Sequence, residues 1–387
     1  MPLRLIGGIC FLWALSWGIM VPDVQVRVKG LGAEGAWLGF VLASLSIAQL
    51  LAAPPLSRWS DLTGRRRVLL ICAFASLIGF FGYGLAGSPT MVLFARVFLG
   101  IGGALVPIAF AYVADSSSAE QRVTALGKIG AALALGFIVG APIGGAISER
   151  PGSSAWIFGG AGIVITILYA ALILRLPDSK PRAPQGSLFT GITRVLESRL
   201  VMSLVIVFLV AEIAFSLIES TFINLHVDHF QSTARTAGMM IGIMGICEAI
   251  TQGIGLRALQ AKVPVGRLIF FGLTLQALTL GLIPFAPVSW GTGLVVAVIG
   301  VGIGMANPCI AGLISWHTSP EDQGGLFGVA QACTCIGRIV GPITANMLYT
   351  DVRFWAPYVL ASALLIVPMI ITLRKAREVE CSGPVRA

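Results

Sequence analysis

Residues 57–70 read S-R-W-S-D-L-T-G-R-R-R-V-L-L, and this stretch decides how the rest of the chain is interpreted. It holds an acid, Asp61, a glycine, Gly64, and three consecutive arginines, while apolar runs flank it at residues 36–56 and 68–86. Apolar runs of about 20 residues are typical of helices that cross a lipid bilayer. The stretch therefore predicts a tight, charged connection between two membrane helices.

The composition of the chain also indicates a membrane protein. Of its 387 residues, 56% are hydrophobic and only 11% are charged, whereas soluble domains average about 25% charged residues. The net charge of +9 does not indicate nucleic-acid binding, because the basic residues mostly flank apolar runs, as they do in cytoplasmic loops. The seven cysteines show no paired metal spacing. We therefore expect a chain that spans the lipid bilayer, with no nucleic-acid partner, no metal and no cofactor.

Twelve runs are long and apolar enough to span a bilayer, six on each side of a polar connection. They are residues 4–28, 35–56, 67–86, 89–113, 123–147, 154–175, 200–225, 236–256, 265–285, 290–315, 325–348 and 354–374. The first run is interpreted as a retained span rather than a removed signal peptide.

The distribution of basic residues predicts the orientation of these spans. Twelve spans place both termini on the same side of the membrane. If that side is cytoplasmic, nearly all lysines and arginines lie inside, and the opposite loops hold only Arg27, Lys29, Arg150, Arg235 and Arg353. Such an excess of inside charge is the usual topology signal. The sequence therefore predicts cytoplasmic termini in the plasma (inner) membrane.

The chain divides into two halves that resemble each other. We expect an N-terminal bundle at residues 1–176, a cytoplasmic linker at 177–199 with a short surface helix at 188–197, a C-terminal bundle at 200–376 and a cytoplasmic tail at 377–387. Glycine and proline patterns recur at a spacing of about 200 residues, for instance around Pro142 and Pro342. A duplicated pair of six-helix halves is typical of secondary transporters with a mid-membrane site between the halves.

Three sequence patterns resemble those of the major facilitator superfamily. The first is Ser57-x-x-Ser60-Asp61-x-x-Gly64-Arg65-Arg66, the second is Leu93-x-x-Arg96-x-x-Leu99-Gly100-x-Gly102, and the third is Gly136-x-x-x-Gly140-Ala-Pro142-x-Gly144-Gly145. They depart from the family's patterns at Ser57, Leu62, Leu99 and Ala141. The third pattern is similar to that of the drug/proton antiporter (tetracycline/multidrug efflux) branch. The resemblance implies an all-α membrane protein with twelve transmembrane helices in two pseudo-symmetric six-helix bundles.

The resemblance implies a cytoplasmic gate formed by Asp61, Gly64, Arg65 and Asp115. Gly64 permits a tight turn that a Cβ would hinder, and a carboxylate is stabilised beside an arginine. The alternative is that the arginines only anchor the topology.

Arg96 lies inside an apolar helix, where a charged side chain costs at least ~2.5 kcal/mol at the bilayer centre and therefore faces the bundle. The resemblance implies that it takes part in proton coupling, and the alternative is a structural contact with a buried ion or a carbonyl group.

The glycines and proline of the third pattern, Gly136, Gly140, Pro142, Gly144 and Gly145, allow another helix to approach closely. The resemblance implies that they form a hinge and seal between the halves. Close helix packing explains the same residues equally well.

A few acids lie within the expected spans, and intramembrane ionisable residues are functional candidates. Glu212 and Glu219 are seven residues apart and share one helix face. As proton or substrate sites we rank Glu212 and Glu248 first, then Glu219 and then Asp23, and Arg338 is the basic residue among them. The alternative is a static charge pair of Arg338 with Glu248 or Glu212.

Other polar and aromatic residues have weaker interpretations. Trp13, Trp17 and Met20 form a stripe that suits either an apolar pocket or ordinary packing. His226 and His229 are interpreted as parts of a solvated outer loop.

We expect a proton-driven antiporter that exports small amphipathic compounds by rocker-switch alternating access, acting as a monomer on a small-molecule substrate and protons. A proton-coupled symporter of a sugar or organic acid and a non-transporting membrane sensor remain alternatives. The sequence holds no nucleophile–base constellation that indicates an enzyme, and no Walker-type loop that indicates an ATP-driven pump.

Overall fold

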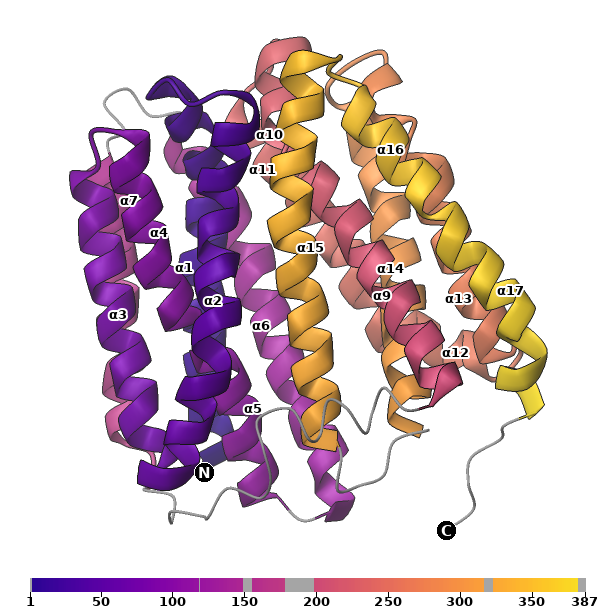
Figure 1. The fold of residues 1–387 in the computed structure, drawn as a ribbon, viewed down its shortest axis with the longest axis horizontal. Coiled ribbons are helices and arrows are strands. Elements are labelled where there is room, and N and C mark those ends of the chain that lie inside the picture. The colour runs from indigo at the N-terminus through magenta and orange to yellow at the C-terminus, as the bar shows by residue number, and fades with distance from the viewer. Residues whose placement is uncertain (1, 118, 149–154, 178–197, 317–322, 382–387) are drawn as a thin grey trace. The chain divides into compact units, whose positions relative to one another are not determined.

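The computed structural model describes residues 2–117, 119–148, 155–177, 198–316 and 323–381, and every regular element in these ranges is a helix (Figure 1). The chain forms two compact units. Unit 1 comprises Met1–Leu188 with Thr233–Met239, and unit 2 comprises Phe189–Ser232 with Met240–Ala387. The expected surface helix at 188–197 lies outside the described residues.

Unit 1 is a bundle of long helices. Its elements are α1 (Pro2–Gly30), α2 (Gly35–Thr63), α3 (Arg65–Leu85), α4 (Pro89–Gly103), α5 (Leu105–Ser116), α6 (Ala119–Ser148) and α7 (Ala155–Leu174).

The connection between α2 and α3 is tighter than the sequence predicts. The charges of residues 57–63 predict part of a loop, but α2 continues through them to Thr63 and α3 begins at Arg65. Gly64 alone makes the turn, with φ of 100°, a backbone conformation that glycine adopts without the strain a Cβ would cause. The charges of this stretch are therefore held on two rigid helix ends.

Local sequence also fixes where α4 begins. Ser88 is the N-cap residue and its hydroxyl accepts a hydrogen bond from the backbone N–H of Met91, while Pro89 occupies the first helical position. Both choices suit a helix N-terminus, because a serine side chain satisfies a free N–H and proline has none to satisfy.

Two apolar cores lie along unit 1, and α1 contributes to both. The first core packs Ile6 and Ile9 of α1 around Tyr169. The second packs Met20 and Val24 of α1 around Tyr83. Because α1 passes through both cores, side chains along its length are held in fixed positions.

Unit 2 contains the remaining helices. Its elements are α9 (Arg199–Glu219), α10 (Phe222–Asn224), the π-helix η1 (Leu225–His229), most of α11 (Ala234–Ile250), the π-helix η2 (Thr251–Gly255), α12 (Leu256–Gln260), α13 (Val265–Leu280), the 3-10 helix η3 (Ile283–Phe285), α14 (Gly291–Trp316), α15 (Gln323–Asp351), α16 (Ala356–Leu364) and α17 (Ile366–Cys381).

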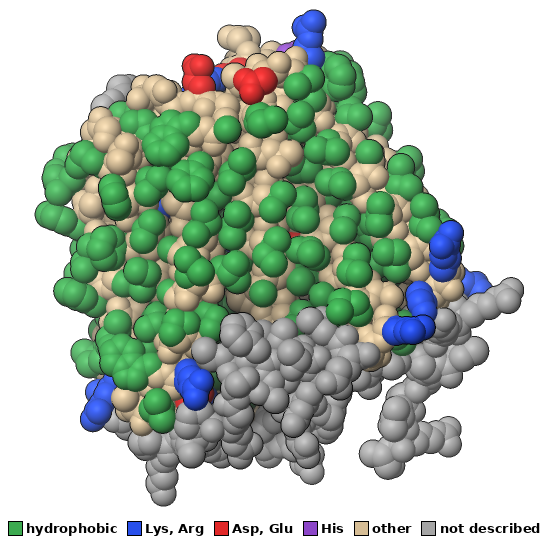
Figure 2. All heavy atoms as spheres, viewed as in Figure 1, with side chains coloured by type: hydrophobic (Ala, Val, Ile, Leu, Met, Phe, Trp, Pro, Cys, Tyr) green, Lys and Arg blue, Asp and Glu red, His purple; other side chains and the backbone are tan. Residues whose placement is uncertain are grey.

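Eleven helical segments among the described residues are long and apolar enough to cross a membrane. α15 is not among these eleven segments. With 29 residues it is long enough to cross a membrane, but Gln331, Thr334 and Arg338 lower its mean hydropathy. With α15 the helical segments number twelve within the described ranges, in agreement with the expected fold class. In the face shown in Figure 2, apolar side chains are spread over the middle of the molecule, and acidic and basic side chains lie mainly near its upper and lower ends.

The two units repeat the same helix contact. In unit 1, a Cβ on Gly102 of α4 would collide with Ser76 of α3. In unit 2, a Cβ on Gly302 of α14 would collide with Gln276 of α13. The matching positions lie about 200 residues apart, which agrees with the duplication that the sequence indicates.

Candidate functional site

The charged cluster of unit 2 is built where α15 crosses α9. Gly337 and Gly341 are one turn apart on α15 and lie directly against Glu212 and Ser216 on α9. A Cβ at either glycine would overlap α9, so both positions require a residue without a side chain. This close crossing brings Arg338, the neighbour of Gly337, to the acidic face of α9.

Arg338 forms an ion pair with the last residue of α9. Its Nε atom lies 3.6 Å from Oε2 of Glu219. Glu212 is within reach of the Thr334 hydroxyl and of the Arg338 charge. The Glu219 side chain is 16% exposed and that of Arg338 is 29% exposed, so the pair is only partly shielded. The crossing thus assembles two acids and one arginine from two helices.

Glu248 of α11 extends the cluster. Its Oε1 accepts a hydrogen bond from Nε2 of Gln252 at 2.8 Å, and it lies close enough to Glu212 for their charges to repel. A Cβ on Gly304 of α14 would meet the Glu248 carbonyl oxygen, so this acid also lies at a close helix crossing. Glu219 and Glu212 therefore lie near one guanidinium and Glu248 lies near Glu212, so a proton on one of the acids relieves the repulsion between carboxylates.

The structure adds a partner to the charge pair that the sequence left as an alternative. That alternative paired Arg338 with Glu248 or Glu212, and the structure shows an ion pair with Glu219, while Glu212 also lies within reach of the Arg338 charge. Spacing along α9 correctly places Glu212 and Glu219 on one face. The position of Arg338 along that face depends on how α15 crosses α9 at Gly337 and Gly341, and the spacing of residues in the sequence does not determine this crossing.

Asp23, the other acid among the candidates, lies in unit 1 and is enclosed by partners. Arg27 donates from Nε and Nη2 to its two oxygens, at 2.7 and 3.1 Å, and Tyr83 donates to Oδ2 at 2.5 Å. The Arg27 guanidinium also lies 5.7 Å from the centre of the Tyr83 ring. Asp23 is buried together with its compensating charge, which suits a fixed ion pair better than a mobile proton site.

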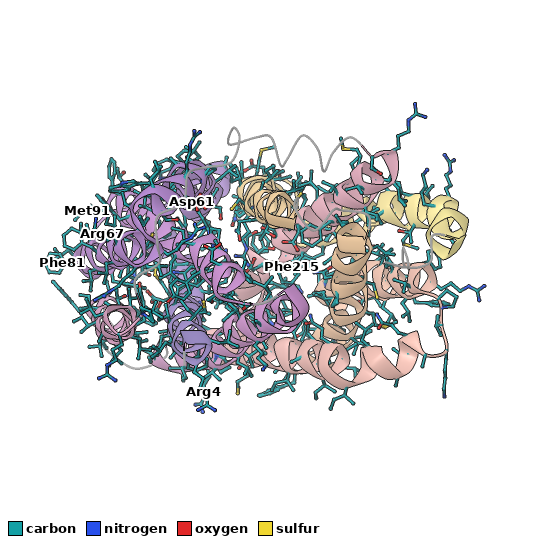
Figure 3. The ribbon with its side chains drawn as sticks, turned by 90° about the horizontal axis from the view of Figure 1, so that it is seen from below. Arg4, Asp61, Arg67, Phe81, Met91 and Phe215 are labelled. Carbon is teal, nitrogen blue, oxygen red and sulfur yellow. The ribbon has the colours of Figure 1, made fainter. Side chains whose placement is uncertain are left out.

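The residues of the expected cytoplasmic gate are in contact within unit 1. Arg65 lies 2.5 Å from Oδ1 of Asp61 and 3.1 Å from Oδ2 of Asp115, and it donates to the Ser60 hydroxyl at 2.7 Å. Arg65 is buried although its neighbour Arg67 is exposed. Figure 3 views this end of unit 1, where Arg67 lies at the periphery. The arginine run therefore contains one paired residue and one that faces outward.

Arg96 of α4 binds backbone carbonyl groups of α2. Its Nε donates to the Val41 oxygen at 3.0 Å and its Nη2 donates to the Leu42 oxygen at 2.6 Å. The carbonyl contact that the sequence left as an alternative is therefore present. Such contacts hold α2 and α4 together whether or not Arg96 also takes part in coupling.

An Arg96→Ala variant is expected to lower the thermal stability of the protein by several degrees, because the two carbonyl groups lose charge-assisted hydrogen bonds worth about 1.5–3 kcal/mol each. Arg96→Lys, which keeps the charge and one donor, is expected to recover part of the loss. Thermal unfolding in detergent measures both. Unchanged stability of the alanine variant with lost transport would contradict the packing role and favour coupling.

The glycines of the third pattern line the crossing of α6 and α1. A Cβ on Gly136, Gly140 or Gly144 would overlap the backbone of α1. Gly145 instead faces the backbone of Ala234, which belongs to unit 1. Pro142 lies within α6. Close packing is thus observed, and the hinge role stays a prediction.

The aromatic stripe on α1 is partly packed. The rings of Trp13 and Trp17 are stacked with centroids 6.3 Å apart, and Trp17 lies 5.0 Å from Phe137 of α6. Both tryptophans are half-buried, whereas Met20 is buried in the second core. The two tryptophans stay candidates for a pocket, and Met20 serves packing.

Sequence reasoning missed His226. Its charged neighbours favour a solvated loop, but its side chain is fully buried in η1. Its ring lies 4.7 Å from that of Phe222 and 5.5 Å from that of Phe230. These aromatic residues lie four positions before and after it, a helical spacing that indicates burial. In the described part of the chain, no three His, Cys, Asp or Glu residues are placed to hold a metal ion.

Comparison with known proteins agrees with this architecture. The sequence pattern of the Major Facilitator Superfamily matches residues 6–342 and 204–380. Multidrug resistance protein 1 of Bacillus subtilis (strain 168) is 27% identical over 366 residues, covering 94% of this chain and 93% of that protein. Quinolone resistance protein NorA of Staphylococcus aureus (strain MSSA476) is 24% identical over 364 residues, with coverage of 94% and 93%.

Solved structures share the fold. The human organic anion transporter MFSD10 (TETRAN) superposes with a TM-score of 0.74 at 20% identity, covering 96% of this chain and 98% of that one. The nucleoside transporter NupG gives a TM-score of 0.75 at 16% identity, with coverage of 97% and 100%.

The family match and the multidrug resistance relatives show that the chain is a transporter rather than an enzyme. The chain belongs to the Major Facilitator Superfamily. Its membership makes it an integral membrane protein that handles a small-molecule substrate.

Proposed function

We propose that this protein is a proton-coupled antiporter that exports small amphipathic compounds by alternating access of its two six-helix units. The observation that carries the proposal is the cluster of Glu212, Glu219, Glu248 and Arg338 in unit 2. An antiporter needs a carboxyl group that binds a proton from one side and releases it to the other. When one of two acids beside the same arginine binds a proton, it loses its charge, and the arginine can then pair with the other acid.

The proposed substrates follow from the relatives. The two bacterial proteins above are named for multidrug and quinolone resistance. The half-buried Trp13 and Trp17, beside Phe137, offer an aromatic surface that suits the apolar part of such compounds. We propose that these aromatic residues contact the substrate and that the acids of unit 2 exchange the proton.

The proposed orientation places both termini in the cytoplasm and the protein in the plasma (inner) membrane as a monomer. The basic residues at the Arg65 end of unit 1 support this orientation through the positive-inside rule. The linker at 177–199 then lies in the cytoplasm. A reporter fused to either terminus tests the orientation.

Transport in proteoliposomes tests the coupling. With an imposed pH gradient, we expect an amphipathic dye to move against the proton flow, and no movement when a protonophore abolishes the gradient. Dye accumulation in the direction of the proton would contradict antiport and favour symport. Movement that ignores the gradient would contradict proton coupling altogether.

An Asp61→Asn variant tests the cytoplasmic gate. Asn keeps the size of the side chain but removes the charge that pairs with Arg65, so the gate closes less firmly. We expect transport to slow about tenfold while the substrate dissociation constant stays within about twofold, since one charge-assisted contact is worth about 1.5–3 kcal/mol.

Asp115→Asn serves as the matched comparison, because Asp115 holds the same guanidinium from α5. A double variant should be slower than either single one. Transport at the wild-type rate in all three would reduce the charged stretch to a topology anchor.

A further inference from the structure

The end of unit 2 that carries α10 and η1, opposite the end of α17, holds a buried histidine that the proposed proton exchange does not use (Figure 1). His226 is seven residues beyond Glu219, on the helical segment that runs from Arg199 to His229. A π-helix such as η1 is rare and often marks a functional position.

Both ring nitrogens of His226 have hydroxyl partners at the start of α14. Nδ1 lies 2.9 Å from Oγ of Ser289, and Nε2 lies 3.1 Å from Oγ1 of Thr292. The Thr292 hydroxyl in turn donates to the Ser289 carbonyl oxygen at 2.7 Å. The ring of His226 therefore links the acid-bearing segment to α14 by hydrogen bonds.

The second of these contacts determines which ring nitrogen carries the proton. A threonine hydroxyl has one hydrogen, and Thr292 uses it on the Ser289 carbonyl. Thr292 can therefore only accept at Nε2, so Nε2 carries a hydrogen. In the neutral ring Nδ1 then has none and accepts a hydrogen bond from Ser289.

A second proton on the ring does not fit this arrangement. A protonated Nδ1 is a donor, so the Ser289 hydroxyl has to turn its own hydrogen away and find another acceptor. The ring lies between Phe222 and Phe230, and a charge placed against apolar rings loses its hydration. The contact thus favours the neutral ring.

Other titratable groups surround the joint. On η1 they are Asp228, which accepts from the Tyr349 hydroxyl of α15 at 3.4 Å, and His229, which stacks on Phe354 at 4.0 Å. Tyr358 of α16 lies 3.4 Å from the Thr221 hydroxyl. The first turn of α14 carries no acid.

We propose that His226 is a positioning residue that, as the neutral Nε2–H tautomer, fixes the segment bearing Glu212 and Glu219 to α14, and that protonation at Nδ1 releases this joint. The inference rests on the proposed function only where it concerns transport. Its direct consequence is a pH-dependent stability of unit 2, which does not require that the protein exchange protons for a substrate.

Three variants of the full-length protein test the proposal. His226→Gln keeps an N–H donor for Thr292 but cannot take up a proton in this range. His226→Phe keeps an aromatic ring and loses both hydrogen bonds. His229→Gln is the matched control, because His229 lies three residues away on the same turn and is exposed.

Thermal unfolding in detergent is measured from pH 8 to pH 5.5. A histidine in an unfolded chain takes up its proton near pH ~6.5. If the folded joint holds the neutral ring, acid lowers the stability of the wild type and of His229→Gln, and lowers that of His226→Gln less. A pH dependence in His226→Gln equal to that of the wild type would overturn the proposal.

Transport gives the second readout. We expect His226→Phe to transport about tenfold more slowly than the wild type, as the loss of two hydrogen bonds implies, and His226→Gln to recover most of the rate. A wild-type rate in His226→Phe would overturn the positioning role. If the wild type shows no proton-coupled transport, the proposed function fails while the unfolding comparison still decides the state of His226.

Discussion

Glu212→Gln and Glu219→Gln variants are expected to lose proton-driven transport, by about a hundredfold or more, while a Glu34→Gln variant keeps it. Glutamine has the size of glutamate and keeps one acceptor oxygen, but it carries no charge and cannot bind and release a proton. Both acids lie in the cluster around Arg338, whereas Glu34 precedes α2 and is exposed. Intramembrane acids are costly to keep, so their removal should affect function far more than that of an exposed acid.

The measurement is substrate-induced proton release from purified protein, combined with pH-gradient-driven dye movement in proteoliposomes. A variant that lacks the carrier should release no proton when the dye binds, although dye binding persists. Proton release that persists in both variants and also in Glu248→Gln would remove all three acids as carriers. Release lost only in Glu248→Gln would move the carrier from α9 to α11.

The Glu212→Gln and Glu219→Gln variants differ in their effect on the ion pair with Arg338. Glu219 forms the ion pair, so Glu219→Gln leaves the arginine charge to Glu212, while Glu212→Gln leaves the ion pair intact. We therefore expect Glu219→Gln also to change the pH at which protons leave the remaining acids. The two variants should differ in pH profile even though both stop coupled transport.

Most of the fold could be predicted from the sequence because bilayer thickness sets the length of each apolar run. One expected run, 89–113, is divided at Ala104 into α4 and α5. The other ends of α1 to α7 follow from such runs to within a few residues, except at residues 57–63. There the charges suggested a loop, but polar side chains at a helix end face water without ending the helix. Only Gly64, the residue that tolerates positive φ, determines where the helix stops.

The candidate site could be predicted only in part. Periodicity places Glu212 and Glu219 on one helix face, because both belong to the same helix. It cannot give the pairing of Glu219 with Arg338, which depends on how α15 is positioned along α9. The sequence does contain the pair Gly337 and Gly341, four residues apart, which indicates close packing against another helix. The pair does not indicate which helix or which residues lie opposite.

The hydrogen-bond partners of His226 could not be predicted from the sequence, for a different reason. Its neighbourhood in the sequence contains charges, which suggested a solvated loop, yet Phe222 and Phe230 at helical spacing indicated a buried face. Its partners Ser289 and Thr292 are more than sixty residues away, so no local pattern gives them. Burial could have been inferred, but the hydrogen bonds required the structure.

Valine substitutions at the α6 glycines are expected to have the second large effect, this time on stability. A Cβ on Gly140 or Gly144 would overlap the backbone of α1, at Leu15 and Ile19 respectively. The two helices would have to separate, and overpacking of this kind costs about 1–3 kcal/mol or more. For a unit of this size we expect the midpoint of thermal unfolding to fall by roughly 3–10 °C.

Gly130 on the same helix provides the matched control, because a Cβ there meets no other atom within 4 Å. Gly130→Ala should leave the unfolding midpoint unchanged or raise it, since alanine favours a helix by about 1 kcal/mol over glycine. The comparison also separates the two interpretations of the glycine pattern. Lost stability in Gly140→Val and Gly144→Val assigns these glycines to packing between α6 and α1. An unchanged midpoint with lost transport would contradict that prediction and assign them to a hinge, because a hinge must move without contributing to the stability of the resting bundle.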